Sequence, residues 1–215
     1  MSTVLRTKIQ ITGAGRTDTG VHAKLMVAHF DLESTLYPEY NLLDKLNSIL
    51  PHDISIHKII EVIPTAHARF DAISRSYEYH VVTKKDVFKK GFAAQINDKL
   101  DFESMNKAAQ LLLKHSDFTS FSKLHTDVKT NICLITHAEW TQLDDEWVFK
   151  ISANRFLRNM VRAIVGTLFE VGNHKMSVDE FRAVIEAKNR CRAGVSVPAH
   201  GLYLVDIQYP IDIFM

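Results

Sequence analysis

Features that would place a chain in a specialised class are scarce or absent in this sequence of 215 residues. It has only two cysteines, Cys133 and Cys191, which lie far apart and in no metal-ligand spacing. No stretch approaches the roughly 18 to 20 apolar residues that a membrane span needs, and the first residues lack the charged and apolar regions of a secretory signal. These absences predict a soluble protein of a reducing, cytoplasmic setting with no membrane partner.

Charge of one sign is not in excess either. The 26 Lys and Arg nearly balance the 25 Asp and Glu, which leaves a net charge of +1. This balance neither indicates nor excludes a nucleic-acid partner, because phosphates respond to the local distribution of charge. The eleven histidines form no HExxH or comparable cluster, so we expect scattered structural or surface histidines and no metal site.

What is present is the composition of a globular protein, with 46% hydrophobic and 24% charged residues. Residue periodicity predicts strands at 8–11, 25–30, 54–62, 76–82, 134–142, 147–153 and 203–209, and helices at 40–50, 102–113, 154–171 and from 178 onward. Asp101 is the expected N-cap of the second helix, and Ser177 with Glu180 predicts a capping box on the last. Strands and helices interleave irregularly, which favours an α+β fold with a mainly antiparallel sheet.

A loop with three glycines at 13–23 reads Gly-Ala-Gly-Arg-Thr-Asp-Thr-Gly-Val-His-Ala. A dinucleotide-binding GxGxxG motif would need glycine where Asp18 stands, and a carboxylate there would repel a pyrophosphate. The spacing of a Walker A motif is also present, but Val21 and His22 stand where Lys and Ser or Thr belong. Composition alone therefore favours a plain turn.

A reactive site is the other interpretation of this loop. Arg16 and Asp18 lie close together on a loop, where reactive groups tend to be placed by a rigid scaffold. An arginine beside a carboxylate keeps it ionised. An ionised carboxylate with little water around it can act as a nucleophile or as a base.

Residues 13–23 resemble, position by position, the signature of the TruA family of tRNA pseudouridine synthases. The resemblance implies that Asp18 is the catalytic residue. It also implies that Arg16 helps to extrude the target nucleotide and then faces the aspartate.

A second stretch, His67-Ala68-Arg69-Phe70-Asp71-Ala72 followed by Arg75-Ser76-Tyr77-Glu78-Tyr79, is similar to the family's second motif. The residues alone favour Tyr77 and Tyr79 as ordinary aromatics on one face of a strand. The resemblance places Tyr77 against the target base, where an extruded base is held by stacking, and it makes Arg69 a further substrate-binding candidate.

A third stretch, 154–166, resembles the family's Met-Val-Arg motif. On the predicted helix, Arg155, Arg158 and Arg162 form a narrow basic stripe beside a wide apolar face. Such a stripe is usually only solvated, but three arginines without an acid suggest phosphate contact. The resemblance implies that Arg162 pairs with the catalytic Asp18.

The closing stretch 198–204 is similar to the family's Pro-x-x-Gly-Leu-x-Leu motif, with Leu202 and Leu204 as expected core residues. The resemblance implies the pseudouridine synthase fold: two α+β subdomains with a mainly antiparallel sheet and a central active-site cleft. We expect an N-terminal subdomain at 1–68 that carries the catalytic loop and a C-terminal subdomain at 69–215. Family members carry a further strand and helix ahead of Met1, so the N-terminal subdomain is expected to be incomplete.

The function implied by the resemblance is isomerisation of uridine to pseudouridine at positions 38 to 40 of the tRNA anticodon stem-loop. The reaction is redox-neutral, so no cofactor or metal is expected, and the family works as a homodimer on tRNA. The competing hypothesis is a catalytically impaired RNA-binding homologue that lacks the N-terminal strand and helix.

Overall fold

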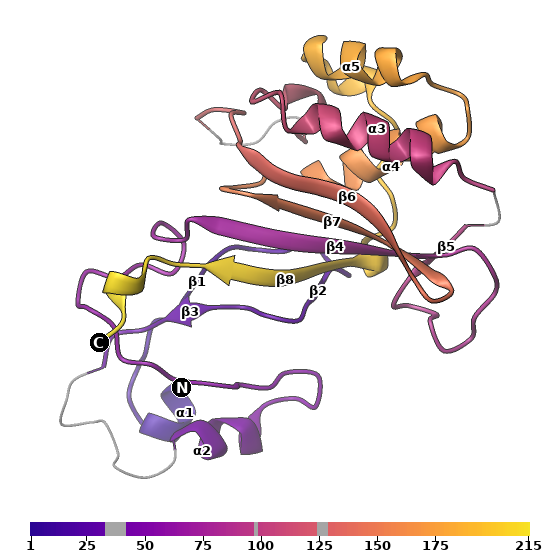
Figure 1. Cartoon of the computed structure of the whole chain (residues 1–215). Helices are drawn as coiled ribbons and strands as arrows, with labels where there is room; N and C mark the ends of the chain where they lie inside the picture. Colours follow the sequence, from indigo (N-terminus) through magenta and orange to yellow (C-terminus); the bar gives the residue numbers. More distant parts are fainter. Residues whose placement is uncertain (33–41, 97–98, 124–128) are drawn as a thin grey trace. The chain divides into compact units, whose positions relative to one another are not determined.

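The computed structural model of the chain describes residues 1–32, 42–96, 99–123 and 129–215 (Figure 1). The chain divides into two compact units, which we treat separately. Unit 1 comprises Met1–Gly15, Val27–Ala72 and Tyr209–Met215, and unit 2 comprises Arg16–Met26 and Ile73–Gln208. The division into subdomains at 1–68 and 69–215 stays a prediction. Residues 16–26, which include Asp18, group with unit 2.

Unit 1 contains short elements. These are α1 (Ser2–Leu5), β1 (Thr12–Gly13), β3 (Ala28–His29), α2 (Leu42–Ile49) and the 3-10 helix η5 (Ile211–Ile213). β1 pairs with β3 in the antiparallel sense, and an isolated bridge joins Val62 to Phe214. Leu42 and Leu46 are the buried residues of α2, one turn apart on its apolar face.

The predicted strand at 54–62 is wrong except for the bridge at Val62. The backbone of Ile56 is satisfied by a side chain instead, since Asn47 donates to its carbonyl at 2.8 Å and accepts from its N–H at 2.7 Å. Alternation of apolar residues could not reveal this partner. No strand forms at the expected 8–11, and the nearest strand, β1, begins at Thr12. The predicted start of α2 at residues 40 and 41 lies outside the described residues.

Unit 2 is built on one sheet whose strands lie in the order β2 (His22–Ala23), β8 (Leu202–Gln208), β4 (Ser74–Val82), β7 (Glu146–Ala153) and β6 (Ile135–Leu143). The short β5 (Ala94–Gln95) also pairs with β4. The three long pairings, β4–β8, β4–β7 and β6–β7, are antiparallel, whereas β2–β8 and β4–β5 are parallel. The prediction of an α+β fold with a mainly antiparallel sheet is confirmed.

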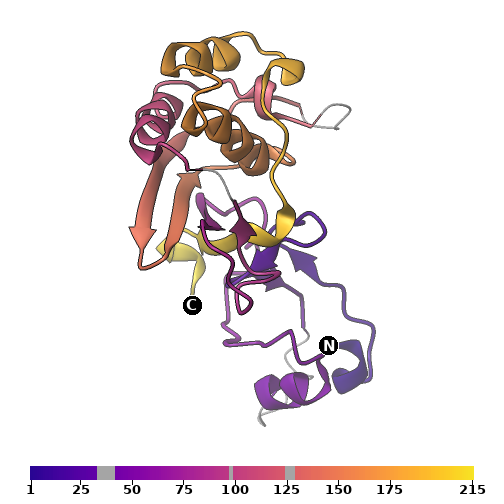
Figure 2. The ribbon, with the colours of Figure 1, turned by 90° about the vertical axis from the view of Figure 1, so that its right-hand side faces the viewer.

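Figures 1 and 2 both show α3 (Phe102–Leu112) and α4 (Met160–Gly172) on one face of this sheet, with α5 (Val178–Glu186) packed beyond them. The layer between them and the sheet is apolar, with Trp140, Phe149 and Ile164 almost completely buried. Burial of such side chains is the main stabilising contribution to the fold, at about 25 cal/mol per Å² of apolar surface. The 3-10 helices η2 (Thr119–Phe121), η3 (Arg190–Arg192) and η4 (Ala199–Gly201) lie in the connections of this unit.

The predicted helix at 154–171 begins six residues later than expected, at Met160. Asn154 directly follows β7 and bonds to Leu134, which directly precedes β6. Its N–H donates to Leu134 O, and its side-chain oxygen accepts from Leu134 N. Asn159 adopts a left-handed conformation with φ 65°, which an α-helix does not allow at its interior. Arg155 and Arg158 therefore precede the helix, and the basic stripe is not the face of one helix.

Helix α3 begins where its cap predicts. Asp101 accepts hydrogen bonds from Ser104 N at 3.0 Å and from Ser104 Oγ at 2.7 Å, and these bonds lower the pKa of its carboxyl. The capping box of Ser177 and Glu180 on α5 is likewise confirmed. Local cap signals thus position two of the three helices.

We expect Asp101→Ala to lower the free energy of unfolding by about 1 kcal/mol at pH 7. Because the folded pKa of Asp101 is below its ordinary value of 3.8, this contribution is present above pH 3.8 and is lost as the pH falls through the folded pKa. Urea unfolding at a series of pH values measures it. Asp101→Asn, which can still cap, is the control, and an equal loss in both variants would contradict the capping role.

Candidate active site

Asp18 lies in a tight turn that only glycine closes easily. Val21 N donates to Asp18 O at 3.0 Å, and Gly20, the third residue of this turn, has φ 83°. A turn with positive φ at its third residue is the type II arrangement, which favours glycine there. A Cβ on Gly20 would also come within 3.4 Å of Ala199. The interpretation as a turn and the interpretation as a site are therefore both compatible with this loop.

The strand after this turn fixes the loop to the sheet of unit 2. β2 pairs in parallel with β8, with His22 opposite Tyr203, and Lys24 N donates to Leu204 O at 2.8 Å. β8 in turn pairs with β4, which carries Tyr77. Asp18 is thus placed at the edge of the sheet that contains Tyr77.

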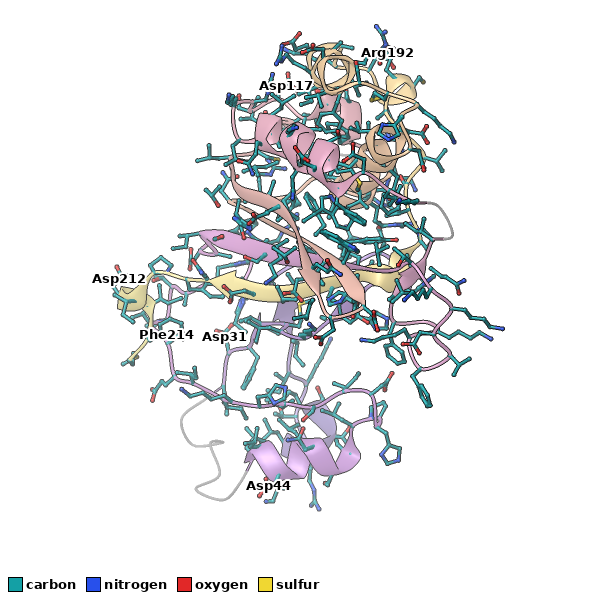
Figure 3. All side chains as sticks on the ribbon, turned by 45° about the vertical axis from the view of Figure 1, so that its right-hand side comes forward. Asp31, Asp44, Asp117, Arg192, Asp212 and Phe214 are labelled. Atoms are coloured by element: carbon teal, nitrogen blue, oxygen red, sulfur yellow. The ribbon has the colours of Figure 1, made fainter. Side chains whose placement is uncertain are left out.

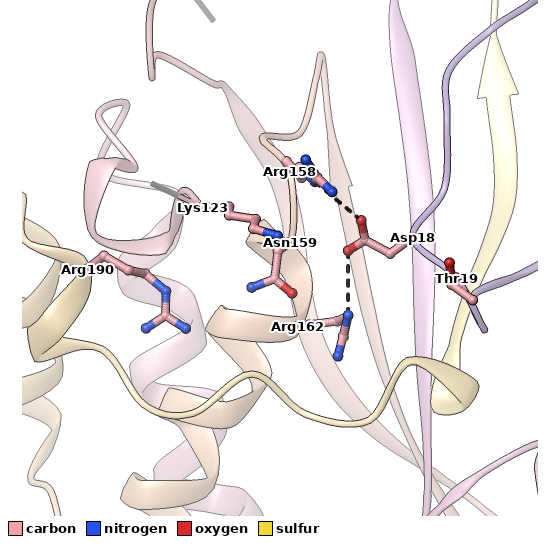
Figure 4. Close-up of a pocket in the computed structure, with 7 residues that line it drawn as sticks. All are labelled: Asp18, Thr19, Lys123, Arg158, Asn159, Arg162 and Arg190. Carbon is pink, nitrogen blue, oxygen red and sulfur yellow. Dashed lines mark hydrogen bonds and ion pairs between the residues drawn. The ribbon is translucent and has the colours of Figure 1, made fainter. Parts of the chain in front are cut away.

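Two arginines face the carboxylate of Asp18 (Figure 4). Arg162 Nη1 lies 3.5 Å from Oδ2, and Arg158 Nε lies 3.8 Å from Oδ1. The side chains of Asp18 and Arg162 are about one quarter exposed, at 27% and 21%, whereas Arg158 is 59% exposed. Each oxygen therefore has a cation nearby without a short hydrogen bond, which neutralises the charge and leaves lone pairs for chemistry.

Arg162 is held from behind by the main chain. Its Nε donates to Val197 O at 2.7 Å, and Val197 N donates to Arg162 O at 3.2 Å. The loop at 194–197, which contains Val197, approaches α4 closely at two glycines. A Cβ on Gly166 would overlap the carbonyl oxygen of Val195, and a Cβ on Gly194 would lie 2.8 Å from Gly166 O. The position of the Arg162 guanidinium thus depends on backbone packing between α4 and residues 194–197.

Tyr77 is largely covered and close enough to Asp18 to feel its charge. Burial raises the pKa of Tyr77, Arg75 opposes this, and the negative charge of Asp18 raises the pKa further. The ring contacts Phe156 edge-on, with centroids 5.2 Å apart and planes at 88°. The register between β4 and β8 shifts between Ser76 and Tyr77, and such a bulge re-aims the side chains that follow.

Asp18 and its neighbours line a pocket of about 680 Å³. The lining residues are Asp18, Thr19, Lys123, Arg158, Asn159, Arg162 and Arg190, all drawn in Figure 4. One carboxylate therefore shares the pocket with four cationic side chains. Such an excess of positive charge attracts the phosphates of a nucleic acid locally, in a chain whose net charge is close to zero.

The structure brings together only some of the predicted site residues. Asp18 and Arg162 are in contact, and Tyr77 lies within electrostatic range of Asp18. Arg16 is exposed two residues ahead of Asp18. Arg69 belongs to unit 1, where its guanidinium lies 5.7 Å from the ring centroid of Phe70.

Four pocket residues were not predicted as site residues: Thr19, Lys123, Asn159 and Arg190. Arg158 was recognised as part of a basic stripe but not as a neighbour of Asp18. No local pattern identifies Lys123 or Arg190, which come from loops that only the tertiary structure brings together.

The described residues hold neither a candidate metal site nor a helix that could span a membrane. The residues outside the gaps at 33–41, 97–98 and 124–128 contain no group of three or more His, Cys, Asp or Glu side chains that could hold a metal ion. Within the same ranges, no helix is long and apolar enough to cross a membrane.

Comparison with known proteins gives one consistent result. A family profile described as tRNA pseudouridine synthase matches residues 108–210. The chain is 58% identical over 214 residues to tRNA pseudouridine synthase A of Parabacteroides distasonis, covering 100% of this chain and 85% of that protein. The protein of the same name from Bacteroides fragilis is 58% identical over 215 residues with the same coverage, and that from Bacillus subtilis is 39% identical over 204 residues, covering 94% and 82%.

Proposed function

Since the chain belongs to the tRNA pseudouridine synthase A family, we propose that it isomerises uridines of tRNA to pseudouridine with Asp18 as the catalytic carboxylate. The observation that carries the proposal is the placement of Asp18 between Arg158 and Arg162 in a pocket with four cations. A carboxylate that is about one quarter exposed and has a cation beside each oxygen is suited to reaction at a sugar carbon. The surrounding cations are suited to an RNA backbone.

The chemistry needs no redox partner. The bond between N1 of the base and C1′ of the ribose breaks, the base turns, and a bond forms between C5 and C1′. The proton on C5 is released and N1 gains one, so atoms and electrons balance. Asp18 reacts either by attack on C1′ or by removal of the proton on the neighbouring sugar carbon, and in both cases its lone pairs must be free.

The other site residues receive supporting roles in this proposal. Tyr77, on β4 and within electrostatic range of Asp18, lies against the target base through its ring. The exposed Arg16 fills the stack that the extruded base leaves, and Arg69 contributes a contact to the RNA. The ion pair between Asp18 and Arg162, on which the proposed catalysis depends, is present. No observation on the described residues therefore favours a catalytically impaired RNA-binding protein.

Arg162 tests the electrostatic part of the proposal. We expect Arg162→Gln to reduce the single-turnover rate by roughly 10²-fold, the scale seen when one preorganised charged donor is removed from an active site. Arg158→Gln is the matched control at the same carboxylate. Because Arg158 is more exposed and more distant, its loss is expected to stay below roughly tenfold. Equal losses in the two variants would contradict a special role for Arg162.

The proposed activity is measured on unmodified tRNA transcripts labelled with tritium at C5 of uridine. Formation of the C5–C1′ bond releases this tritium into water, so release reports turnover directly. Mapping of the modified nucleotides then tests whether they are positions 38 to 40 of the anticodon stem-loop. Absence of release from every tRNA tested would refute the proposal.

The assembly and setting of the enzyme are part of the same proposal. We propose that it acts as a homodimer in the cytoplasm, on the support of the family resemblance and of a sequence with only two cysteines, neither in a disulfide within the described residues. Sedimentation analysis at micromolar concentration tests the dimer, and a monomer there would contradict it.

A further inference from the structure

The pocket has a cationic side that Asp18 does not neutralise. Figure 4 shows Lys123 and Arg190 on one side, Asp18 and Thr19 on the other, and Asn159 between them. Asp18 is engaged by Arg158 and Arg162. Among the described residues, no carboxylate lies within ion-pair distance of Lys123 or Arg190. These two cations therefore add uncompensated positive charge away from the reactive carboxylate.

Arg190 is fixed before any ligand arrives. Its Nη1 donates to Ala193 O at 3.3 Å and to Gly194 O at 3.1 Å, and its Nη2 donates to Ser196 Oγ at 3.0 Å. Asn159 Nδ2 contacts the same hydroxyl. In the part of the chain that the structure describes, these bonds leave the Nε proton and one Nη2 proton of Arg190 for an anion. A cation that is already oriented loses little conformational entropy on binding.

The segments that lead to Lys123 and Arg190 are joined through the buried Ser120. Ser120 Oγ, in η2, accepts from Asn189 N at 2.9 Å and donates to Val184 O at 2.6 Å. This link joins the segment before Lys123 to the segment before Arg190. The Asn159 side chain also lies at the N-terminus of α4, where the helix dipole favours an anion.

We propose that Arg190 and Lys123 bind one backbone phosphate next to the target nucleotide, a role that rests on the proposed function. An extruded nucleotide stays bonded to its two flanking phosphates, so a site that receives its sugar at Asp18 must also accommodate a phosphate nearby. Asp18 would repel that phosphate. The cationic side of the pocket is the place where a phosphate meets oriented donors and no carboxylate.

The test replaces phosphates one at a time by neutral methylphosphonates in an anticodon stem-loop RNA. Dissociation constants are measured by fluorescence anisotropy, and pseudouridine formation is followed on the same RNAs. We expect one substitution beside the target to weaken binding to the unchanged protein roughly tenfold, as for loss of a charge-assisted hydrogen bond. In Arg190→Gln the same substitution should weaken binding by much less than tenfold, because only Lys123 still contacts that phosphate.

Arg192→Gln is the matched control, because Arg192 lies on the same 3-10 helix but is exposed and does not line the pocket (Figure 3). It should keep the full sensitivity to the methylphosphonate. Lys123→Gln, at an exposed position, provides a second variant that should fold normally and lose part of this sensitivity.

The outcomes separate the two proposals. If Arg190 only fastened residues 193–196, Arg190→Gln would lower the melting temperature but retain the tenfold effect of the methylphosphonate, and the phosphate site would be refuted. If the unchanged protein forms no pseudouridine on any RNA, the proposed function fails, while the binding measurements still decide whether Arg190 and Lys123 hold a phosphate.

Discussion

Asp18→Asn is expected to abolish pseudouridine formation while tRNA binding is retained. The substitution keeps the size of the side chain and its place in the turn, since that turn uses the backbone carbonyl of residue 18. What it removes is the negative charge and the reactive lone pairs. We expect the single-turnover rate to fall by more than about 10⁴-fold, the scale on which loss of a reacting group acts.

Binding should respond in the opposite direction. Asp18 is the one carboxylate among the pocket residues, facing four cations. Its neutralisation leaves Arg158 and Arg162 without their anionic partner and raises the positive charge of the pocket. The affinity for tRNA phosphates should therefore stay equal or increase, with the difference shrinking at high salt.

Tritium release and anisotropy titration measure the two effects in parallel. Asp144→Asn is the matched control, because Asp144 is an exposed turn residue with φ 52°, a conformation that asparagine adopts readily. It should change neither rate nor affinity. Turnover of Asp18→Asn at a rate near that of the unchanged protein would refute the assignment of the catalytic residue.

The parts of the fold that were predicted are those in which local and tertiary signals agree. The cap of α3 at Asp101, the capping box of α5 and the alternating strands β4, β6, β7 and β8 each carry their own sequence signature. The start of α4 was not predicted, because Asn154 bonds to a distant strand end and Asn159 adopts a left-handed conformation. Apolar periodicity continued through both residues and gave no sign of either contact.

The candidate site likewise contains residues that a sequence motif predicted and residues that no motif predicted. Asp18 and Arg162 were proposed from motifs that lie 144 residues apart, and the structure places them 3.5 Å from each other. Lys123 and Arg190 have no motif around them. The segments that carry them are joined by a part-buried hydrogen bond from Asn189 N to Ser120 Oγ, and such a contact leaves no periodic trace in the sequence.

Gly166→Ala is the second substitution with a large expected effect, and its sign is opposite to the usual one. Replacing glycine by alanine inside a helix ordinarily stabilises it by about 1 kcal/mol. At this position the added methyl would overlap Val195 O, which is backbone and cannot rotate away. We expect a net loss of about 2 kcal/mol in the free energy of unfolding, within the range for overpacked cores.

The comparison variant for stability is Gly15→Ala. A Cβ on Gly15 would meet no heavy atom within 4 Å, and its φ lies outside the left-handed range. Its free energy of unfolding should stay within about 0.5 kcal/mol of the unchanged protein. Urea unfolding measures both variants, and a neutral or stabilising Gly166→Ala would contradict the close approach of α4 to residues 194–197.

The effect on catalysis follows from the same displacement. A methyl at Gly166 pushes the 194–197 loop outward, and this loop carries the Val197 carbonyl that holds Arg162 Nε at 2.7 Å. Arg162 then turns away from Asp18, and misplacement of a catalytic group by about 1 Å can reduce a rate by roughly 10²-fold. If the loss is transmitted through Arg162, the double variant with Arg162→Gln should be hardly slower than Arg162→Gln alone. Losses that multiply would instead show that Gly166 acts on stability or RNA binding by a route separate from the Arg162–Asp18 pair.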